Sequence, residues 1–260
     1  MATIKEVAKV AGTSPSTVSR VLNGVETVDP VLVERVQLAA KQLNYQFNLA
    51  GRSLRTGSDL AFGPDFEIRS RQNEDVKRQV ARRAVDFVDL SDVIILDSGS
   101  TVAYMVTYLP DGPLIYTYSL AVLQPAAKRQ LSVHLAPGLY VPNLAAVFGT
   151  ETELYFKNQK STKYFFSTAR VDVRTGLFNQ HPTTCAVKQA ILAESEMSIL
   201  LVDHTKFIDA HLSTYATLFD IDVLITDFVP EPFLPALQDA GVRLVQIHSQ
   251  ESEIRGGFND

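Results

Sequence analysis

Polar residues gather at the ends of several short apolar runs in the second half of the chain. Asp97-Ser98-Gly99-Ser100-Thr101 ends one run, Thr117-Tyr118-Ser119 ends the next, and Asp203-His204-Thr205-Lys206 ends a later one. Hydroxyl groups, a glycine that allows close backbone approach and the free N–H groups of a following helix are the groups that hold a phosphate. The alternative for residues 97–101 is an ordinary strand-to-helix cap, and the alternative for Lys206 is a surface ion pair.

A second group of polar residues, near the N-terminus, could contact the bases or phosphates of a nucleic acid. Arg20 falls on a short amphipathic segment, and its guanidinium can donate two hydrogen bonds to O6 and N7 of guanine. Ser14, Thr17 and Ser19 suit phosphate contacts or helix caps, which position a protein on DNA without reading its sequence. The alternative for Arg20 is a phosphate clamp.

The distribution of charge agrees with DNA binding by the N-terminal part alone. The chain has 260 residues and a net charge of −5. Residues 1–57 hold seven basic and four acidic side chains, a net charge of +3, so the remainder carries −8. A basic segment on an acidic body is expected where only the first part meets phosphates.

Three short helices are predicted within the first 43 residues. Thr3 is a cap for the first helix, which Gly12 ends. Ser14-Pro15 begins the second helix and Asn23-Gly24 stops it, and Asp29-Pro30 begins the third. Two helices joined by a tight turn and followed by a third form the plan of a helix-turn-helix unit.

These residues resemble the headpiece of the LacI family. The resemblance runs through TIKEVAKVAGTSPSTVSRVLNG to the later NLAGRSLRTG, although the family usually has Ala where Gly51 stands. It implies that Pro15, Ser16 and Arg20 read bases in the major groove. The full set of DNA-contacting residues that it implies is Thr3, Ser14, Pro15, Ser16, Thr17, Ser19, Arg20, Asn23, Asn48, Arg52 and Leu54.

The resemblance extends to a hinge helix at residues 48–55. In the family this helix is ordered only on operator DNA, and Leu54 matches the leucine that each of two chains wedges into the minor groove. Eight residues are too few for a stable isolated helix, and Gly51 weakens it further. A wedge at a dyad implies a homodimer or homotetramer on palindromic double-stranded DNA. The alternative is that Leu54 packs against the next domain.

A connector is predicted at residues 58–72, interrupted by Gly63-Pro64. A helix is expected at 74–89, with its apolar side chains inward and its basic side chains on a solvated face. Those basic side chains are Lys77, Arg78, Arg82 and Arg83.

From residue 90 onward, short β-branched apolar runs alternate with helical stretches. The predicted strands are 93–98, 114–119, 131–135, 163–168, 199–203, 223–227 and 242–247. The predicted helices are 101–109, 120–129, 184–196 and 231–240. Apolar strands separated by helices are typical of a mostly parallel α/β sheet covered on both faces, so the chain is expected to join an all-α headpiece to an α/β domain at 73–260.

In series, the second-half motifs resemble the C-terminal sensor domain of the DeoR family. FEIR, IILDSGST, TYSL, PGL, GLF, VKQA, VDHTKF and VLITD follow in its order. The family resembles ribose-5-phosphate isomerase in fold, and its members respond to phosphorylated sugars. By this resemblance Ser98, Gly99, Ser100 and Thr101 hold the phosphate, while Asp97, Thr117, Ser119 and Lys206 line the sugar side. Tyr118 and Phe178 stand where the family usually has Asn and Thr, and would make the pocket more apolar or narrower.

We therefore predict a regulator that represses a carbohydrate operon, binds operator DNA and responds to a phosphorylated sugar, without cofactor or metal. No apolar run is long enough for a membrane span, and the N-terminus lacks a signal-peptide core, which favours the cytoplasm. The first alternative is an isomerase, which needs a carboxylate base. The acidic loop expected in such an enzyme reads Ser167-Thr168-Ala169-Arg170-Val171-Asp172 here. The second alternative is a regulator driven by a protein partner.

Overall fold

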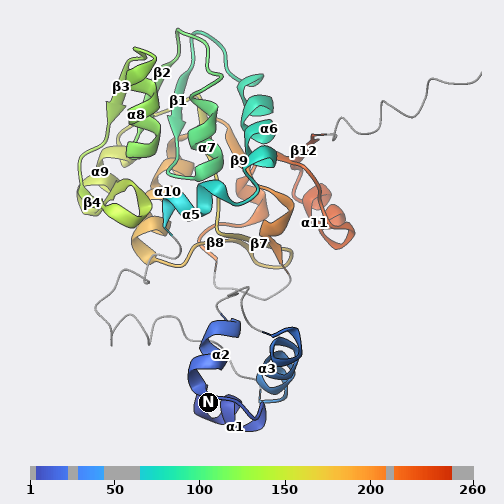
Figure 1. The fold of residues 1–260 in the computed structure, drawn as a ribbon. Coiled ribbons are helices and arrows are strands. Elements are labelled where there is room, and N and C mark those ends of the chain that lie inside the picture. The colour runs from blue at the N-terminus through green and yellow to red at the C-terminus, as the bar shows by residue number, and fades with distance from the viewer. Residues whose placement is uncertain (1–3, 23–28, 44–64, 209–213, 248–260) are drawn as a thin grey trace, which may run out of the picture. The chain divides into compact units, whose positions relative to one another are not determined.

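The computed structural model describes residues 4–22, 29–43, 65–208 and 214–247. The chain divides into two compact units, residues 1–61 and 62–260, which are described separately (Figure 1). The predicted hinge helix at 48–55 lies outside the described residues, as do residues 58–64 of the predicted connector. Residues 65–72 of that connector belong to the second unit.

The first unit contains three helices, α1 (Ile4–Val10), α2 (Pro15–Leu22) and α3 (Pro30–Gln42). The oxygen of the Ser14 side chain accepts the N–H of Thr17 at 3.1 Å, and Asp29 accepts the N–H of Val31 at 2.8 Å. Both residues therefore cap the helices that follow them, as the sequence predicts.

The three helices enclose a small apolar core and are tied together at the first turn. The buried side chains are Val7, Ala8, Ala11, Val18, Val21, Val36 and Ala39. Arg35 of α3 donates to the carbonyl of Ala11 at 2.7 Å, at the end of α1. Gly12 follows with a φ of +61°, a left-handed conformation that glycine adopts at little cost.

The second unit is built on seven parallel strands in the order β12-β11-β9-β6-β1-β2-β3. Each of the seven predicted strands forms one of them, shorter by one to two residues at most ends. Their bounds are β1 (Val93–Leu96), β2 (Leu114–Thr117), β3 (Val133–Leu135), β6 (Lys163–Phe166), β9 (Ser198–Leu201), β11 (Val223–Thr226) and β12 (Arg243–Gln246).

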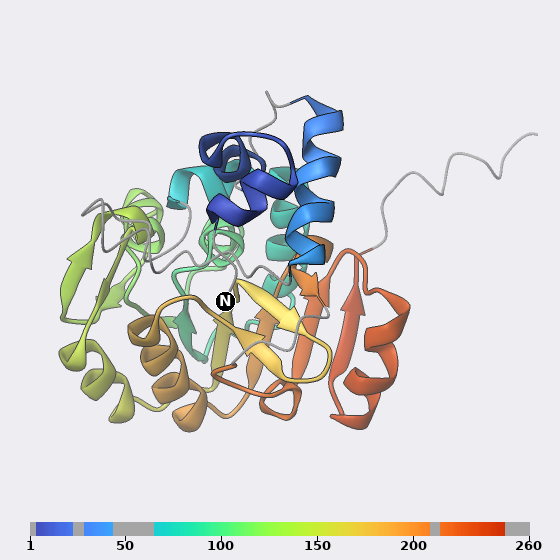
Figure 2. The ribbon, with the colours of Figure 1, turned by 90° about the horizontal axis from the view of Figure 1, so that it is seen from below.

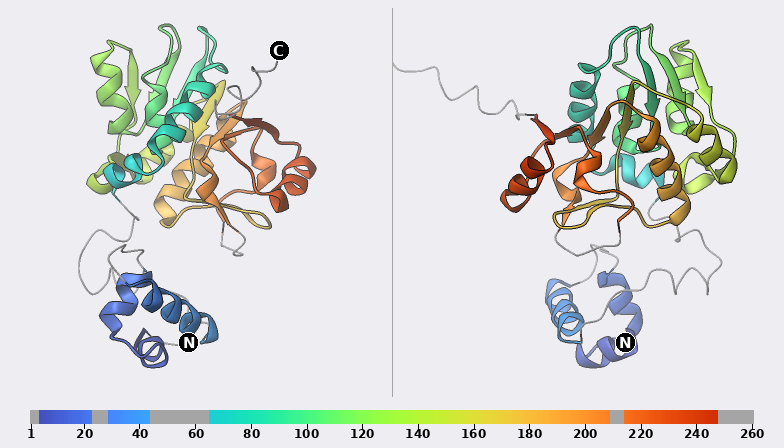
Figure 3. Two further views of the ribbon diagram at one scale, coloured as in Figure 1. Left: turned by 45° about the vertical axis from the view of Figure 1, so that its right-hand side comes forward. Right: turned by 180° about the vertical axis from the view of Figure 1, so that it is seen from behind.

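Helices cover both faces of this sheet (Figures 1 and 3). Successive strand residues face opposite sides of the sheet. Ile94 and Leu96 belong to the apolar cluster formed with α6, α7 and α8, whereas Ile95 belongs to the cluster formed with α9, α10 and α11. The bounds are α6 (Glu74–Val85), α7 (Ser100–Met105), α8 (Leu120–Lys128), α9 (Thr150–Lys157), α10 (Pro182–Glu194) and α11 (Leu234–Asp239). None of the described helices is long and apolar enough to cross a membrane.

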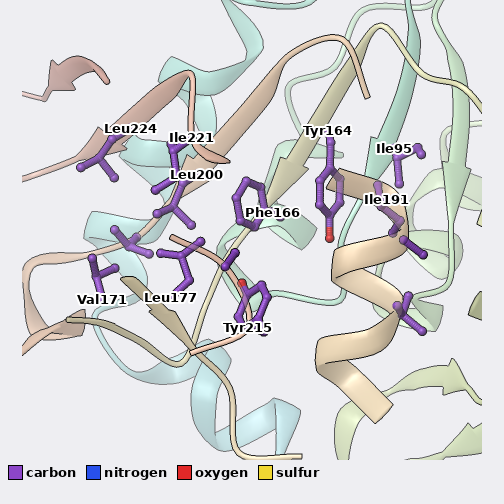
Figure 4. Close-up of a cluster of buried hydrophobic side chains, with 14 of the residues drawn as sticks. Ile95, Tyr164, Phe166, Val171, Leu177, Ile191, Leu200, Tyr215, Ile221 and Leu224 are labelled. Carbon is purple, nitrogen blue, oxygen red and sulfur yellow. The ribbon is translucent and has the colours of Figure 1, made fainter. Parts of the chain in front are cut away.

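The second face includes a dense aromatic cluster. Tyr164 and Phe166 of β6 stack with ring centroids 4.8 Å apart, and Ile191 of α10 and Leu200 of β9 lie beside them (Figure 4). Tyr215 closes the cluster at its lower end. All four residues of β9 and the last three of β6 are buried, which explains why the sequence shows near-continuous apolar runs there.

Several short elements were not predicted. They are β4 (Leu139–Val141), η2 (Pro142–Leu144), β5 (Ala146–Phe148), α9, β7 (Arg170–Asp172), β8 (Gly176–Phe178), η3 (His204–Lys206), β10 (Phe207–Ile208) and η4 (Leu218–Asp220). The helix predicted at 231–240 is present as a 3-10 turn, η5 (Glu231–Phe233), followed by α11. β4 and β5 form one antiparallel pair, and β10, β7 and β8 form a small second sheet. The β7–β8 hairpin and the short helix α5 (Phe66–Arg71) lie at the carboxyl ends of the central strands (Figures 1 and 2).

One prediction for the helix at 74–89 is wrong. The helix α6 ends at Val85, and Lys77 is not on its solvated face: its side chain is 2% exposed. The Lys77 ammonium donates to the carbonyl of Arg69 in α5. The long side chain of a lysine can reach a buried acceptor even where its Cα lies on the polar face of a helix. The pattern of charged residues along the sequence does not show this.

Candidate functional site

The site lies where the order of strands reverses. From β1 the chain moves outward to β2 and β3, and then returns to the other side of β1 at β6 before continuing to β9, β11 and β12. The carboxyl ends of β1 and β6 are therefore neighbours followed by connections that run in opposite directions. In open α/β sheets such a switch point leaves a crevice that binds ligands.

A pocket of about 350 Å³ occupies this position. Residues 97–101 after β1 and 167–170 after β6 form its floor, and residues 178–181 at the end of β8 contribute a wall. Thr184 and Lys188 of α10, Arg69 and Gln72 at α5, Leu144 and Lys206 complete it. The volume is within the range of small-molecule sites.

Asp97 is the centre of a buried polar cluster beneath the pocket. Its Oδ2 atom accepts hydrogen bonds from the Lys188 ammonium at 2.6 Å and from the N–H of Ser167 at 2.9 Å. The Tyr118 hydroxyl donates to the Oδ1 atom. Lys188 also donates to the Ser167 carbonyl at 2.8 Å. The cluster ties β1, β6 and α10 together, so the carboxylate has a structural role and its charge is offset by Lys188.

Burial affects the titration of this cluster. Desolvation lowers the pKa of Lys188, while the neighbouring Asp97 carboxylate acts in the opposite direction. Desolvation, together with the Asp97 charge, raises the pKa of Tyr118 well above its usual range. Tyr118 is therefore a neutral hydrogen-bond donor to a carboxylate near neutral pH.

Gly99 is required by close packing and not by its backbone angles. Its φ is −68°, which any residue adopts. A Cβ atom at this position would lie 2.6 Å from the Cβ of Ser167 and 3.4 Å from Oδ2 of Asp97. The absence of a side chain lets the loops after β1 and β6 meet.

Basic side chains outnumber acidic ones around the pocket. Arg69, Arg170, Lys188 and Lys206 line it, and among the described residues Asp97 is the one carboxylate of the lining. Burial lowers the pKa of Lys206, and the charges of Arg170 and Arg69 lower it further while Asp203 opposes them. Burial also lowers the pKa of Arg69. An anion placed here would relieve repulsion among these cations.

The predicted effector residues divide between the pocket and the layer behind it. The pocket is lined by Asp97, Ser98, Gly99, Ser100, Thr101 and Lys206. Thr117, Tyr118 and Ser119 are fully buried and lie outside the lining. Thr117 donates to the carbonyl of Leu96 at 2.7 Å and accepts the N–H of Ser119 at 3.0 Å, so it fixes the end of β2 beside β1.

Sequence reasoning missed three of the four cations. Arg69, Arg170 and Lys188 come from α5, β7 and α10, which are distant in sequence from residues 97–101. Lys188 belongs to the VKQA motif and Arg69 to the FEIR motif of the DeoR resemblance. Those two motifs are therefore the sequence features from which both pocket residues could have been identified. Arg170 lay in the loop considered only for an enzymatic base.

Other polar residues of these loops, and the cysteine, have identifiable places. His204 is exposed, and its Nδ1 atom lies 2.5 Å from Oδ2 of Asp227. Asp227 also accepts the N–H of His204 at 2.7 Å, which links the ends of β9 and β11. Asp172 is buried and caps the β7–β8 turn by accepting the N–H groups of Arg174 and Thr175 at 3.0 Å. Burial raises the pKa of the half-buried Cys185 thiol, as suits a packing residue.

The DNA-contacting set is described only in part. Ser14, Pro15 and Ser16 are exposed at the start of α2, and Thr17 is half-buried. Ser19 and Arg20 lie on α2, but the structure does not describe their side chains. The remaining members of the set lie wholly outside the described residues: Thr3, Asn23, Asn48, Arg52 and Leu54. The start of α2 is the part of a recognition helix that meets base edges in helix-turn-helix proteins.

These features define a class of protein: a helix-turn-helix unit joined to an α/β domain whose switch-point pocket is rich in cations. Residues 72–228 match the family described as DeoR C terminal sensor domain, and residues 3–48 match bacterial regulatory proteins of the lacI family. The chain belongs to the DeoR sensor family and carries a lacI-family DNA-binding unit, and both resemblances in the sequence are confirmed. It is a transcription regulator and not an enzyme.

Curated relatives support this assignment over most of the chain. The HTH-type transcriptional regulator YulB of Bacillus subtilis is 29% identical over 70% of this chain and 72% of its own length. The L-fucose operon activator of Haemophilus influenzae is 26% identical over 87% of this chain and 85% of its own length. Both are regulators by name.

Among solved structures, ribose 5-phosphate isomerase A from Methanocaldococcus jannaschii is similar with a TM-score of 0.39 and 17% identity. The aligned region covers 54% of this chain and 56% of the isomerase. The parallel sheet and its covering helices establish the α/β fold class independently of this similarity.

Proposed function

We propose that this regulator controls a carbohydrate operon in response to a phosphorylated sugar held in the switch-point pocket. The observation that carries the proposal is the charge of the lining, where the described residues supply four cations and one carboxylate. Since Lys188 offsets Asp97, the charges of Arg170 and Lys206 remain to attract an anion, although Asp203 opposes that of Lys206 in part. A neutral sugar would leave their repulsion in place.

The phosphate is proposed to lie against Ser98, Ser100 and Thr101, with Arg69 and Lys188 as the nearest cations. The polar side chains of Asn179, Gln180 and His181 line the same pocket and suit the hydroxyl groups of a sugar. Phe178 stands beside them, and its ring limits the width of the sugar that fits.

The helix α5 is proposed to carry the signal of ligand binding toward the headpiece. α5 is the first described element of the second unit, contains no buried residue, and contributes Arg69 to the pocket. It is held by polar contacts, because Lys77 donates to the Arg69 carbonyl and Tyr104 donates to the Ser70 carbonyl at 3.1 Å. A ligand that draws Arg69 inward would therefore shift α5 and the connector that precedes it.

The chain is proposed to act as a homodimer or homotetramer in the cytoplasm, with two headpieces on a palindromic operator. Leu54 of each hinge helix would wedge into the minor groove at the dyad. The sugar phosphate would favour the arrangement that binds DNA weakly, so the protein represses and its ligand induces.

A thermal-shift screen of sugar phosphates tests the proposal. A ligand at about 100 times its Kd stabilises the folded state by about 2.7 kcal/mol. The shift should appear with phosphorylated sugars and not with the same sugars lacking phosphate. Ser100→Asp should abolish the shift, because a carboxylate repels the phosphate. If no sugar phosphate shifts the melting temperature, this proposal fails. A change in DNA binding that only a protein partner produces would then support the second alternative from the sequence, a regulator driven by such a partner.

A further inference from the structure

Asn179 connects the segment after β8 to the loop after β6 at the wall of the pocket. Its side-chain Oδ1 atom accepts the N–H of Ala169 at 2.9 Å, and Thr168 of the same loop donates its hydroxyl hydrogen to the carbonyl of Phe178 at 2.9 Å. All four residues line the pocket. These two hydrogen bonds hold the Asn179 side chain in place before a ligand enters, which reduces the cost of ordering it on binding.

The hydrogen bond to Ala169 determines which end of the Asn179 amide is left for a ligand. A backbone N–H group only donates, so the amide atom that it meets is the oxygen. The other end is an NH2 group with two hydrogens to donate, and no group in the described part of the chain accepts either of them. Asn179 is half-buried and this nitrogen is accessible to solvent, so the pocket wall presents a neutral donor.

Two hydroxyl groups of the lining have the opposite polarity. Thr184 donates its hydroxyl hydrogen to the carbonyl of His181 at 2.7 Å, and the hydroxyl of Thr168 is committed to Phe178 in the same way. Both oxygens can still accept a hydrogen bond, but neither has a hydrogen left to give. A ligand oxygen that needs a neutral donor at this wall is therefore served by Asn179 and not by these hydroxyls.

We infer that Asn179 is a specificity-determining residue that donates a hydrogen bond to one oxygen of the sugar part of the effector. The inference rests on the proposed function and deepens it, because it assigns the recognition of one sugar oxygen to one side chain. A hydroxyl and a carbonyl oxygen both accept an N–H, whereas a carbon-bound hydrogen in the same place accepts none. An analogue without this oxygen would leave the amide hydrogens unpaired on binding, and such analogues are strongly rejected.

Deoxy analogues test this inference on the wild-type full chain. The parent probes are ribose 5-phosphate, fructose 6-phosphate, fructose 1-phosphate and glucose 6-phosphate, and the analogues are the singly deoxygenated forms of whichever parent binds tightest in isothermal titration. One analogue should bind ten times or more weakly than its parent. If every analogue binds within threefold of its parent, the inference is wrong and the proposed function stands, whereas no binding by any of the four parents would count against both.

Asn179→Ala assigns the lost contact to this side chain. The variant should bind the parent at least ten times more weakly than wild type does, and it should bind the sensitive analogue within threefold of the parent. It also frees the N–H of Ala169, but a loosened wall would weaken parent and analogue by the same factor and keep the preference between them. Gln238→Ala, which removes an exposed amide of α11 outside the lining, is the control and should keep the wild-type preference. Unliganded melting temperatures verify folding. A preference for the parent that persists in Asn179→Ala would overturn the inference.

Discussion

The buried Asp97–Lys188 pair controls the shape of the pocket floor. The two side chains are 1% and 5% exposed and lie 2.6 Å apart. Lys188→Met should destabilise the protein by about 3–5 kcal/mol, because an unpaired carboxylate then remains buried. Urea unfolding measures this loss. The double variant Asp97→Asn/Lys188→Met removes both charges and should recover part of the stability; if the double variant is as unstable as the sum of the single variants, the two charges do not act as a pair.

The contact between Gly99 and Ser167 offers a second test at this scale. Gly99→Ala adds a Cβ that meets the Cβ of Ser167, so it should cost about 1–3 kcal/mol of stability and weaken sugar-phosphate binding at least tenfold.

Ser167→Gly removes the atom that the new methyl group would meet. The double variant Gly99→Ala/Ser167→Gly should therefore bind the ligand better than Gly99→Ala alone, measured by titration calorimetry. If the second substitution gives no recovery, the two loops do not meet as closely as described.

At the scale of elements, the attachment of α5 to α6 depends on a buried lysine. Burial is the main cause that lowers the pKa of Lys77 from its usual 10.5 to about 8, and the charge of Lys206 contributes. Between pH 8 and 10.5 the unfolded chain binds a proton at Lys77 that the folded chain has released, so this group makes the protein more stable as the pH rises through that window.

Replacing Lys77 by Met should remove this dependence. The difference in unfolding free energy between wild type and Lys77→Met should change by up to about 3 kcal/mol from pH 8 to 10.5, in favour of the wild type at high pH. Chemical denaturation at several pH values measures it, with Arg82→Met as a surface control. Parallel curves for wild type and Lys77→Met would show that Lys77 keeps its ordinary pKa in the fold.

The sequence predicted the elements whose signal is local and strong. The central strands are buried on both faces, so runs such as 93–96 and 223–225 are continuously apolar and easy to recognise. The strands of the β7–β8 hairpin have three residues each, which is too few to show the alternation of apolar and polar residues that predicts a strand. Residues 97–101 were found because they follow a strand, whereas Arg69 and Lys188 reach the pocket from distant helices, which only tertiary packing determines. Lys77 was assigned to the wrong face because helical periodicity does not show where a long side chain ends.

For the whole molecule, a substitution in one unit is expected to impair the function of that unit and to leave the function of the other unit unchanged. Arg20→Ala should reduce discrimination between operator and unrelated duplex by about 1–3 kcal/mol, because a bidentate contact to guanine is lost. The same variant should retain the wild-type thermal shift with the sugar phosphate. Fluorescence anisotropy with the two duplexes measures the first effect. If Arg20→Ala weakens binding to every duplex equally, the residue clamps a phosphate, which is the alternative left open by the sequence.

The most direct test of the whole account is the affinity of the full chain for its selected operator, measured by anisotropy as the sugar phosphate identified by thermal shift is titrated in. A pocket that controls a separate DNA-binding unit should change the operator Kd by about 5–150-fold at saturation, and Ser100→Asp should abolish the change while keeping the unliganded Kd. An operator Kd that stays constant while calorimetry shows the ligand bound would contradict the account.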